Sequence, residues 1–226
     1  MKMTVSILLM MIAGIVNAQT FFFNQLITIE KIGNDQKNGN QISEVQRLIN
    51  ASNSNYVLEF KSDSIAQVRE YSSKRYHDFK IQHYTSIGDL QMMYARTCDE
   101  TELMEKDQKD NHAERTELIK IGENEFEYNS YKKANSKKPF RQLKFKLEES
   151  ASNQLEVLAN LTEDLKTELS QHLDSTKFYT MKEISFWTDG KIHQTYRLKS
   201  TDGARLKIIL PGQLKFECLN PFLGIK

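Results

Sequence analysis

The sequence is poor in glycine and proline, with nine and three in 226 residues, which excludes collagen-like and linker-dominated chains. It also lacks an excess of charge of either sign, since 31 Lys and Arg residues face 30 Asp and Glu residues. A nucleic-acid binder of the usual strongly basic kind is therefore excluded as a description of the whole chain. The remaining composition, 39% hydrophobic and 27% charged, suits one globular domain with a core of its own.

The motifs of common catalytic and cofactor sites are missing as well. There is no glycine-rich phosphate loop and no G-x-S-x-G nucleophile elbow. The five histidines show no metal-ligand spacing, and the oxygen-rich run 107–112 lacks the glycine and terminal glutamate of a calcium loop. The sequence therefore predicts neither a metal site nor a cofactor, and it leaves open whether the protein is an enzyme.

Long hydrophobic runs are absent except at the N-terminus. Lys2 precedes an apolar run of about a dozen residues that ends in Val16-Asn17-Ala18, with small residues at the −3 and −1 positions. This pattern resembles a secretory signal peptide cleaved after Ala18, and the run is short of the ~20 residues of a membrane-spanning helix. We therefore expect residues 1–18 to be a signal peptide and residues 19–226 to form a single domain, secreted or periplasmic, without a stable membrane span.

Export permits a disulfide, and the mature chain holds only two cysteines. Cys98 ends an alternating run through Leu90, Met92 and Tyr94, and Cys218 ends another through Leu214 and Phe216, so both sulfurs are expected to face an apolar side. The sequence favours a Cys98–Cys218 disulfide over two separate buried thiols. Two glycosylation sequons, at Asn50 and Asn160, would matter only in a eukaryotic host, which the sequence does not identify.

Alternating and helical patterns both occur along the mature chain. Alternation predicts strands near 56–60, 90–98, 126–128 and 143–147. Helical spacing predicts a short helix around 42–49, a second from Asp63 to Phe79, and a long amphipathic helix from Ser152 to Leu173. Asp-Gly pairs at 189–190 and 202–203 predict hairpin turns, so the last fifty residues read as a meander with strands near 181–187, 191–199 and 204–210.

The predicted fold class is therefore α+β. The predicted antiparallel sheet is either open or strongly curved and ends in a C-terminal β-meander. One or two amphipathic helices are expected to pack on its face. Charge along the chain comes in blocks, with acidic segments at 97–127 and 148–174 and basic segments at 131–146 and 176–226. These blocks indicate either complementary surfaces within the chain or a basic sheet face that attracts an anionic partner.

Four residues of the predicted meander are the candidate ligand-binding residues. They are Trp187, which precedes a tight turn and would line the rim of a pocket, and His193, Arg197 and Lys199, which lie on the polar face of a strand. The leading hypothesis is an exported, non-enzymatic protein that binds a ligand, or an envelope or extracellular partner, through its sheet or a sheet–helix cleft. The alternatives are a secreted hydrolase with paired carboxylates and a structural component of the cell envelope.

Overall fold

The computed structural model describes residues 18–35, 39–101, 112–159 and 161–218, and it is nearly all sheet. Strands account for 62% of the described residues and helix for 7%, so the α+β class predicted from the sequence is wrong. All eleven strands belong to one antiparallel sheet, whose order is β6-β5-β4-β3-β2-β1-β11-β10-β9-β8-β7. The expected signal peptide falls on residues 1–18, almost wholly outside the described residues.

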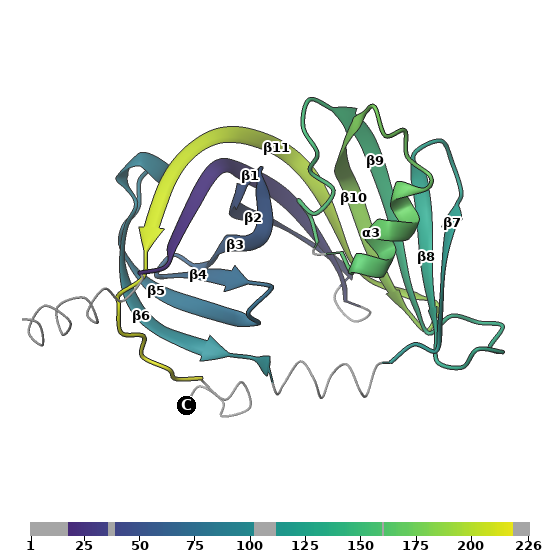
Figure 1. Ribbon diagram of the computed structural model, residues 1–226, viewed down its shortest axis with the longest axis horizontal. Helices are drawn as coiled ribbons and strands as arrows, with labels where there is room; N and C mark the ends of the chain where they lie inside the picture. The colour runs from purple at the N-terminus through teal and green to yellow at the C-terminus, as the bar shows by residue number, and fades with distance from the viewer. Residues whose placement is uncertain (1–17, 36–38, 102–111, 160, 219–226) are drawn as a thin grey trace, which may run out of the picture.

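The strands follow one another along the chain with a single described α-helix between β9 and β10. Their bounds are β1 (Thr20–Asp35), β2 (Gly39–Asn50), β3 (Asn53–Ser62), β4 (Ile65–Glu70), β5 (Arg75–His83), β6 (Gln91–Asp99), β7 (Arg115–Lys120), β8 (Glu125–Tyr131), β9 (Arg141–Ser150), β10 (Phe178–Thr188) and β11 (Lys191–Ile209). A short 3-10 turn, η1 (Ile87–Asp89), precedes β6, and the helix is α3 (Glu163–Ser170). Figure 1 shows that β1 and β11 form a long arch joining the two ends of the sheet.

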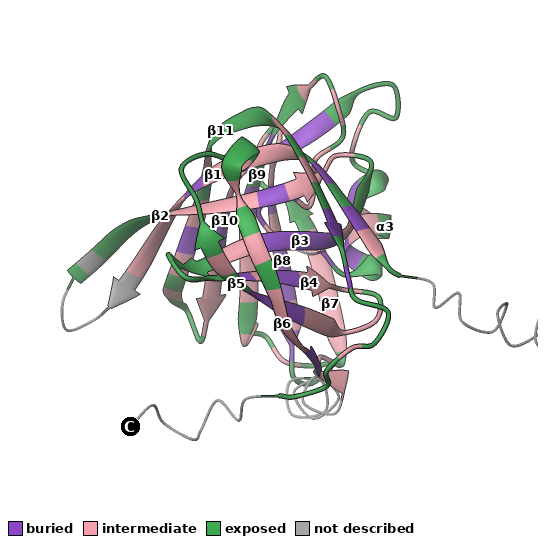
Figure 2. Cartoon of the chain, turned by 90° about the vertical axis from the view of Figure 1, so that its left-hand side faces the viewer, coloured by how far each residue is buried: buried purple, intermediate pink, exposed green. Residues whose placement is uncertain are grey.

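The two ends of the sheet differ in shape. We call β2 to β6, with the ends of the arch that meet them, the rolled half, because these strands curl round on themselves (Figures 1 and 2). We call β7 to β10 the helix-covered half, because the described residues between 152 and 170, including α3, lie over one of its faces (Figure 1). Each half has a core of its own.

The buried face of the sheet changes sides between the halves. In β1, Leu26 pairs with Leu48 and packs in the rolled half, whereas its neighbour Ile27 pairs with Arg47 and lies in the core of the helix-covered half. Neighbouring residues of a strand point to opposite faces. The two cores therefore occupy opposite faces of one continuous sheet, and the strands at its centre are apolar on both sides.

The core of the rolled half is built from aromatic and aliphatic side chains of several strands. Its buried members are Phe21, Phe23, Leu48, Tyr56, Leu58, Ala66, Val68, Phe79, Ile208 and Leu210. The chain after β11 then runs beside β6, where the amide of Thr97 donates to the carbonyl of Lys215 and the amide of Glu217 donates to that of Thr97, both at 2.8 Å. This short parallel contact covers the edge of β6.

The core of the helix-covered half lies between the sheet and the segment from 155 to 169. Its members include Ile27, Ile29, Phe126, Phe145 and Met181 from the strands and Val157, Leu158, Leu161, Leu165 and Leu169 from the covering segment. Thr162 is the N-cap of α3, and its hydroxyl accepts a hydrogen bond from the amide of Leu165. The long helix predicted from Ser152 to Leu173 is thus only eight residues long. Gln154 bridges Thr180, and the residues after it form a turn, in which the amide of Val157 donates to the carbonyl of Gln154 at 3.3 Å, instead of a helix.

The other two predicted helices are strands. Residues 42–49 lie in β2, where Leu48 faces the rolled-half core and Ile49 packs against the other core. The region from Asp63 to Phe79 is a hairpin of β4 and β5, whose turn contains Lys74 at a positive φ of 54°. The two errors have related causes. In β2 both faces are buried, and in the β4–β5 hairpin the turn has no clear sequence signal, so in both segments apolar residues recur about every 3.6 residues.

The two Thr-Asp-Gly segments behave differently. Asp189 and Gly190 both have positive φ, 51° and 78°, and form the turn between β10 and β11. Gly203, in contrast, pairs with Gln25 inside β11, which runs unbroken from 191 to 209, so the predicted second turn is wrong. The arch strand β1 pairs with residues on both sides of Gly203 and holds this stretch extended.

Substitution of the two glycines is expected to separate these roles. Gly190→Val should destabilise the fold by about 1–3 kcal/mol, because a β-branched residue is strained at positive φ. Gly203→Val is the matched control: a Cβ atom added there would meet no atom within 4 Å and its φ is not positive, so we expect a much smaller change. Urea denaturation of both variants measures the difference, and equal losses would contradict the assignment.

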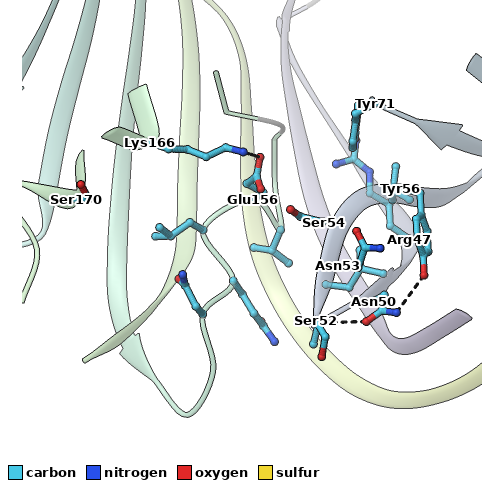
Figure 3. Close-up of a pocket in the computed structure, with 17 residues that line it drawn as sticks. Arg47, Asn50, Ser52, Asn53, Ser54, Tyr56, Tyr71, Glu156, Lys166 and Ser170 are labelled. Carbon is cyan, nitrogen blue, oxygen red and sulfur yellow. Dashed lines mark hydrogen bonds and ion pairs between the residues drawn. The ribbon is translucent and has the colours of Figure 1, made fainter. Parts of the chain in front are cut away.

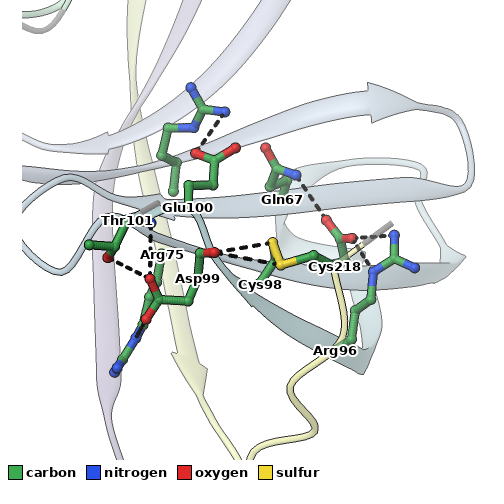
Figure 4. Close-up of a disulfide and its surroundings, with 10 residues drawn as sticks. Gln67, Arg75, Arg96, Cys98, Asp99, Glu100, Thr101 and Cys218 are labelled. Atoms are coloured by element: carbon green, nitrogen blue, oxygen red, sulfur yellow. Dashed lines mark hydrogen bonds and ion pairs between the residues drawn. A yellow bond between two sulfur atoms is a disulfide. The ribbon is translucent and has the colours of Figure 1, made fainter. Parts of the chain in front are cut away.

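The predicted disulfide is confirmed. Cys98 and Cys218 are bonded, with their Cα atoms 4.7 Å apart, and the bond ties the segment after β11 to the edge strand β6 (Figure 4). Alternation suggested that Cys98 and Tyr94 share a face, but they lie on opposite faces of β6. A register shift in the β5–β6 pairing places Tyr94 and Thr97 on the core side, 2.8 Å apart through their hydroxyls, and Cys98 on the other side.

Candidate ligand-binding cleft

A cleft of about 460 Å³ lies between the two halves of the molecule (Figure 3). One wall is the outer surface of the rolled half, formed by the end of β2, the β2–β3 turn and Tyr71. The opposite wall is the segment 153–157 together with Lys166 and Ser170 of α3. The cleft forms because the segment that covers the helix-covered half faces the outer side of the rolled half.

The floor of the cleft is apolar. Ile49, Val57, Leu155 and Val157 line it, and Val57 and Val157 are almost fully buried. Ile49 and Leu155 are only partly buried, so apolar surface remains for a ligand. Ligand cavities typically combine such a floor with a few polar groups that fix orientation.

Arg47 supplies the positive charge on the rolled-half wall. Its Nη1 donates to the carbonyl oxygen of Leu158 at 3.0 Å and so links the two halves, while its guanidinium lies 5.6 Å from the centre of the Tyr196 ring. Nε lies 2.8 Å from Oε1 of Glu59, so the two side chains form an ion pair in which Nε is buried. Arg47 is thus held in place between Glu59 and the covering segment of the other half.

Two groups beside Arg47 have shifted pKa values. Burial opposes ionisation of Glu59, but Arg47 and Lys61 outweigh it and hold the pKa of this carboxyl below its usual range. Burial also raises the pKa of Tyr71. At neutral pH Glu59 is therefore a carboxylate that neutralises Arg47, and Tyr71 keeps its hydroxyl proton as a donor.

The α3 wall carries a second ion-pair group. Lys166 lies 3.0 Å from Glu156 and 2.7 Å from Glu163, and Glu156 also accepts a hydrogen bond from the amide of Leu161. Burial alone would lower the pKa of Lys166, but its two carboxylate partners raise it. Amide side chains complete the rim, with Asn50 donating to the Tyr56 hydroxyl and Gln154 donating to Gln25. The cleft is therefore close to neutral and rich in hydrogen-bonding groups.

Asn50 is the one sequon asparagine whose surroundings are described. Its Oδ1 accepts from the amide of Ser52 at 2.9 Å and its Nδ2 donates to Tyr56 at the cleft rim. Asn160, the other sequon residue, lies outside the described residues.

The four residues predicted to bind a ligand do not line this cleft. Trp187 and Arg197 instead line a shallow groove of about 520 Å³ on the opposite face of the helix-covered half. Arg197 pairs there with Glu183 at 2.6 Å and Glu30 at 3.6 Å, and Lys144 lies 5.2 Å from the Trp187 ring centre. Lys199 pairs with Glu44, and His193 is exposed and lines neither cavity. The structure thus brings together two of the four.

The basic sheet face expected from the charge blocks is largely neutralised. Its eight cations are Lys144, Lys146, Lys191, Arg197, Lys199, Arg205, Lys207 and Lys215. Five of them pair with carboxylates, namely Lys144 with Glu127, Lys146 with Glu125, Arg197 with Glu183, Lys199 with Glu44 and Lys215 with Glu217. Most of these pairs run across neighbouring strands, so complementarity within the chain accounts for most of this face.

In the described part of the chain, no group of three His, Cys, Asp or Glu side chains is close enough together to hold a metal ion. His77 is fully buried in the rolled half, where its Nδ1 lies 2.9 Å from the Thr97 hydroxyl and burial lowers its pKa to about 4. Among the helices described, none is long and apolar enough to cross a membrane.

Comparison with protein-family models and with curated proteins yields no match to the chain.

Proposed function

We propose that this is an exported, non-enzymatic protein that binds a small amphipathic ligand in the cleft between its two halves. The observation that carries the proposal is the combination of a partly exposed apolar floor with polar groups on both walls of the same cleft, Arg47 on one side and Lys166 on the other. A ligand with an apolar body and one acceptor group would cover the floor and satisfy a cleft donor. The Cys98–Cys218 disulfide is compatible with export.

The alternative, a hydrolase with paired carboxylates, has less support. A general acid in such a pair needs a raised pKa, because it must stay protonated near neutral pH. Every described carboxyl group with a resolved shift moves the other way, including Glu59 at the cleft. Glu156 is in turn paired with Lys166. The cleft favours binding over acid–base chemistry.

Filling the cleft tests the proposal. Ala51 lines it from the β2–β3 turn, and Ala51→Trp adds bulk there without removing a buried group. The probe is anilinonaphthalene sulfonate, a fluorescent molecule with an apolar body and one anionic acceptor. We expect the wild-type protein to bind it saturably with one-to-one stoichiometry, and Ala51→Trp to weaken binding about tenfold or more, equivalent to about 1.4 kcal/mol.

The control is a tryptophan at an exposed position away from the cleft, Gln82→Trp at the end of β5, which should bind the probe like the wild type. Both variants are first compared by thermal unfolding, so that a loss of folding is not mistaken for a loss of binding. Undiminished binding by Ala51→Trp, or equal losses in both variants, would rule out this cleft as the binding site.

A further inference from the structure

One end of the helix-covered half carries a concentration of positive charge that the cleft does not use. The loop between β8 and β9 and the first residue of β9, residues 132–141, contain Lys132, Lys133, Lys137, Lys138 and Arg141 and no acidic residue. All five side chains are exposed. We call this segment the basic loop; it lies at the lower right of Figure 1, where β8 ends and β9 begins.

Within the described chain the cations of the basic loop have no ion pairs, unlike the lysines of β9 that follow them. Throughout the described residues, no carboxylate lies within 4 Å of any of its five cations. Only a few residues further along β9, Lys144 and Lys146 are each paired with a glutamate of β8. The charge of the loop is therefore available to a partner, whereas that of the adjoining sheet is not.

The loop is held in a defined shape. The guanidinium of Arg115 stacks on the Tyr131 ring, with its Cζ 3.6 Å from the ring centre, and donates to the carbonyl of Ser136 at 3.1 Å. The amide of Ala134 donates to Glu114 at 3.0 Å, and the amide of Phe140 donates to the carbonyl of Ser130. The five cations are thus presented together, so little ordering is needed when a partner binds.

The neighbouring turn lies at the same end of the molecule. The amide of Asp189 donates to the carbonyl of Phe140, so the β10–β11 turn lies against the loop and contributes one exposed acid, Asp189, and one cation, Lys191. Phe140 is not free to insert into a partner, because Lys132 and Arg141 lie over its ring at 5.5 and 5.6 Å. The turn therefore leaves the net charge of the tip to the basic loop and adds no apolar anchor.

We propose that the basic loop docks on the surface of an anionic lipid bilayer. Lysines on one tip, without a shaped pocket, suit a broad anionic surface better than a single anion, which arginine forks recognise. A linear polyanion would need a continuous basic track, and the glutamates paired with Lys144 and Lys146 interrupt that track immediately beyond the loop. Docking through charge alone would be reversible and sensitive to salt.

The test is sedimentation of the purified, disulfide-bonded protein with lipid vesicles. We expect binding to vesicles of phosphatidylcholine mixed with phosphatidylglycerol, no binding to pure phosphatidylcholine, and loss of binding as salt rises from about 0.05 M to about 0.5 M. The loop variant replaces Lys132, Lys133, Lys137 and Lys138 by glutamine. It should reduce partitioning by about 100-fold or more, since each lysine near an anionic surface contributes several-fold.

The matched control removes the same charge from lysines that already have carboxylate partners, Lys146, Lys177, Lys182 and Lys199, again by glutamine. It should retain most of the binding, and equal losses in both variants would overturn the proposal in favour of overall charge. Binding to dextran sulfate but not to vesicles would also overturn it and assign a linear polyanion.

Discussion

Reduction of the Cys98–Cys218 disulfide is expected to lower the free energy of unfolding by about 4–5 kcal/mol. The bond closes a loop of 120 residues, and in the chain-entropy model the stabilisation grows with the logarithm of loop length. The structure adds a local effect, because the bond holds the segment after β11 against β6 through the two hydrogen bonds at Thr97. Denaturation in guanidinium with and without a thiol reductant measures the change.

A double variant, Cys98→Ala with Cys218→Ala, is the control for this experiment. It should unfold at the midpoint of the reduced wild-type protein and should not respond to reductant. Hydrogen exchange at the amides of Thr97 and Glu217 should accelerate in the variant, because those groups lose their tethered partners. A change in unfolding free energy below about 1 kcal/mol on reduction would show that the disulfide does not stabilise the fold in this way.

Single leucine truncations in the two cores are expected to cost about 2–5 kcal/mol each and to add when combined. Leu58 is fully buried in the rolled half, and Leu165 is almost fully buried under the helix-covered half. Replacement by alanine removes buried methyl groups and leaves a cavity at each position. Because the two side chains belong to separate cores on opposite faces of the sheet, the double variant should lose the sum of the single losses within about 0.5 kcal/mol.

The contrasting pair lies within one core. Leu48 and Leu58 are directly opposite each other on β2 and β3 and are both fully buried in the rolled half. Leu48→Ala and Leu58→Ala should therefore be non-additive, since the second cavity forms beside the first. Urea denaturation of the single and double variants gives both coupling energies, and a strong coupling between Leu58 and Leu165 would contradict the two-core description.

Much of the strand structure could be predicted from the sequence, because strands with one buried face alternate clearly. Leu143, Phe145 and Leu147 point to one side of β9 while Lys144 and Lys146 pair on the other, as the pattern indicated. The disulfide was also predictable, since only one pairing was available. The class was not, because β2 is apolar toward one core at Leu48 and toward the other at Ile49, and such two-sided burial resembles a helical stripe.

The cleft could not be predicted from the sequence pattern for a related reason. Arg47 follows Val45 and precedes Leu48 in a segment interpreted as a helix, so nothing marked it as facing Leu158, more than a hundred residues away. Its proximity to Lys166 and Glu156 depends on how the sheet curves, and local periodicity carries no information about curvature. The candidate residues Trp187 and Arg197 line a groove on a face that is distinct from the cleft.

The pairing of β1 with β11 has a consequence for how the chain reaches its native state. Ile29, early in the chain, lies opposite Leu198, late in the chain, and this central pair joins the two halves of the sheet. The strands from β2 to β6, and those from β7 to β10, can form hairpins with their neighbours soon after synthesis. The apolar residues of β1 cannot pair with β11 until the end of the chain has been synthesised, and contacts of such long sequence separation form slowly. A chain still bound to the ribosome therefore cannot complete its sheet, so we expect it to stay accessible to chaperones and to proteases until the last strand is available.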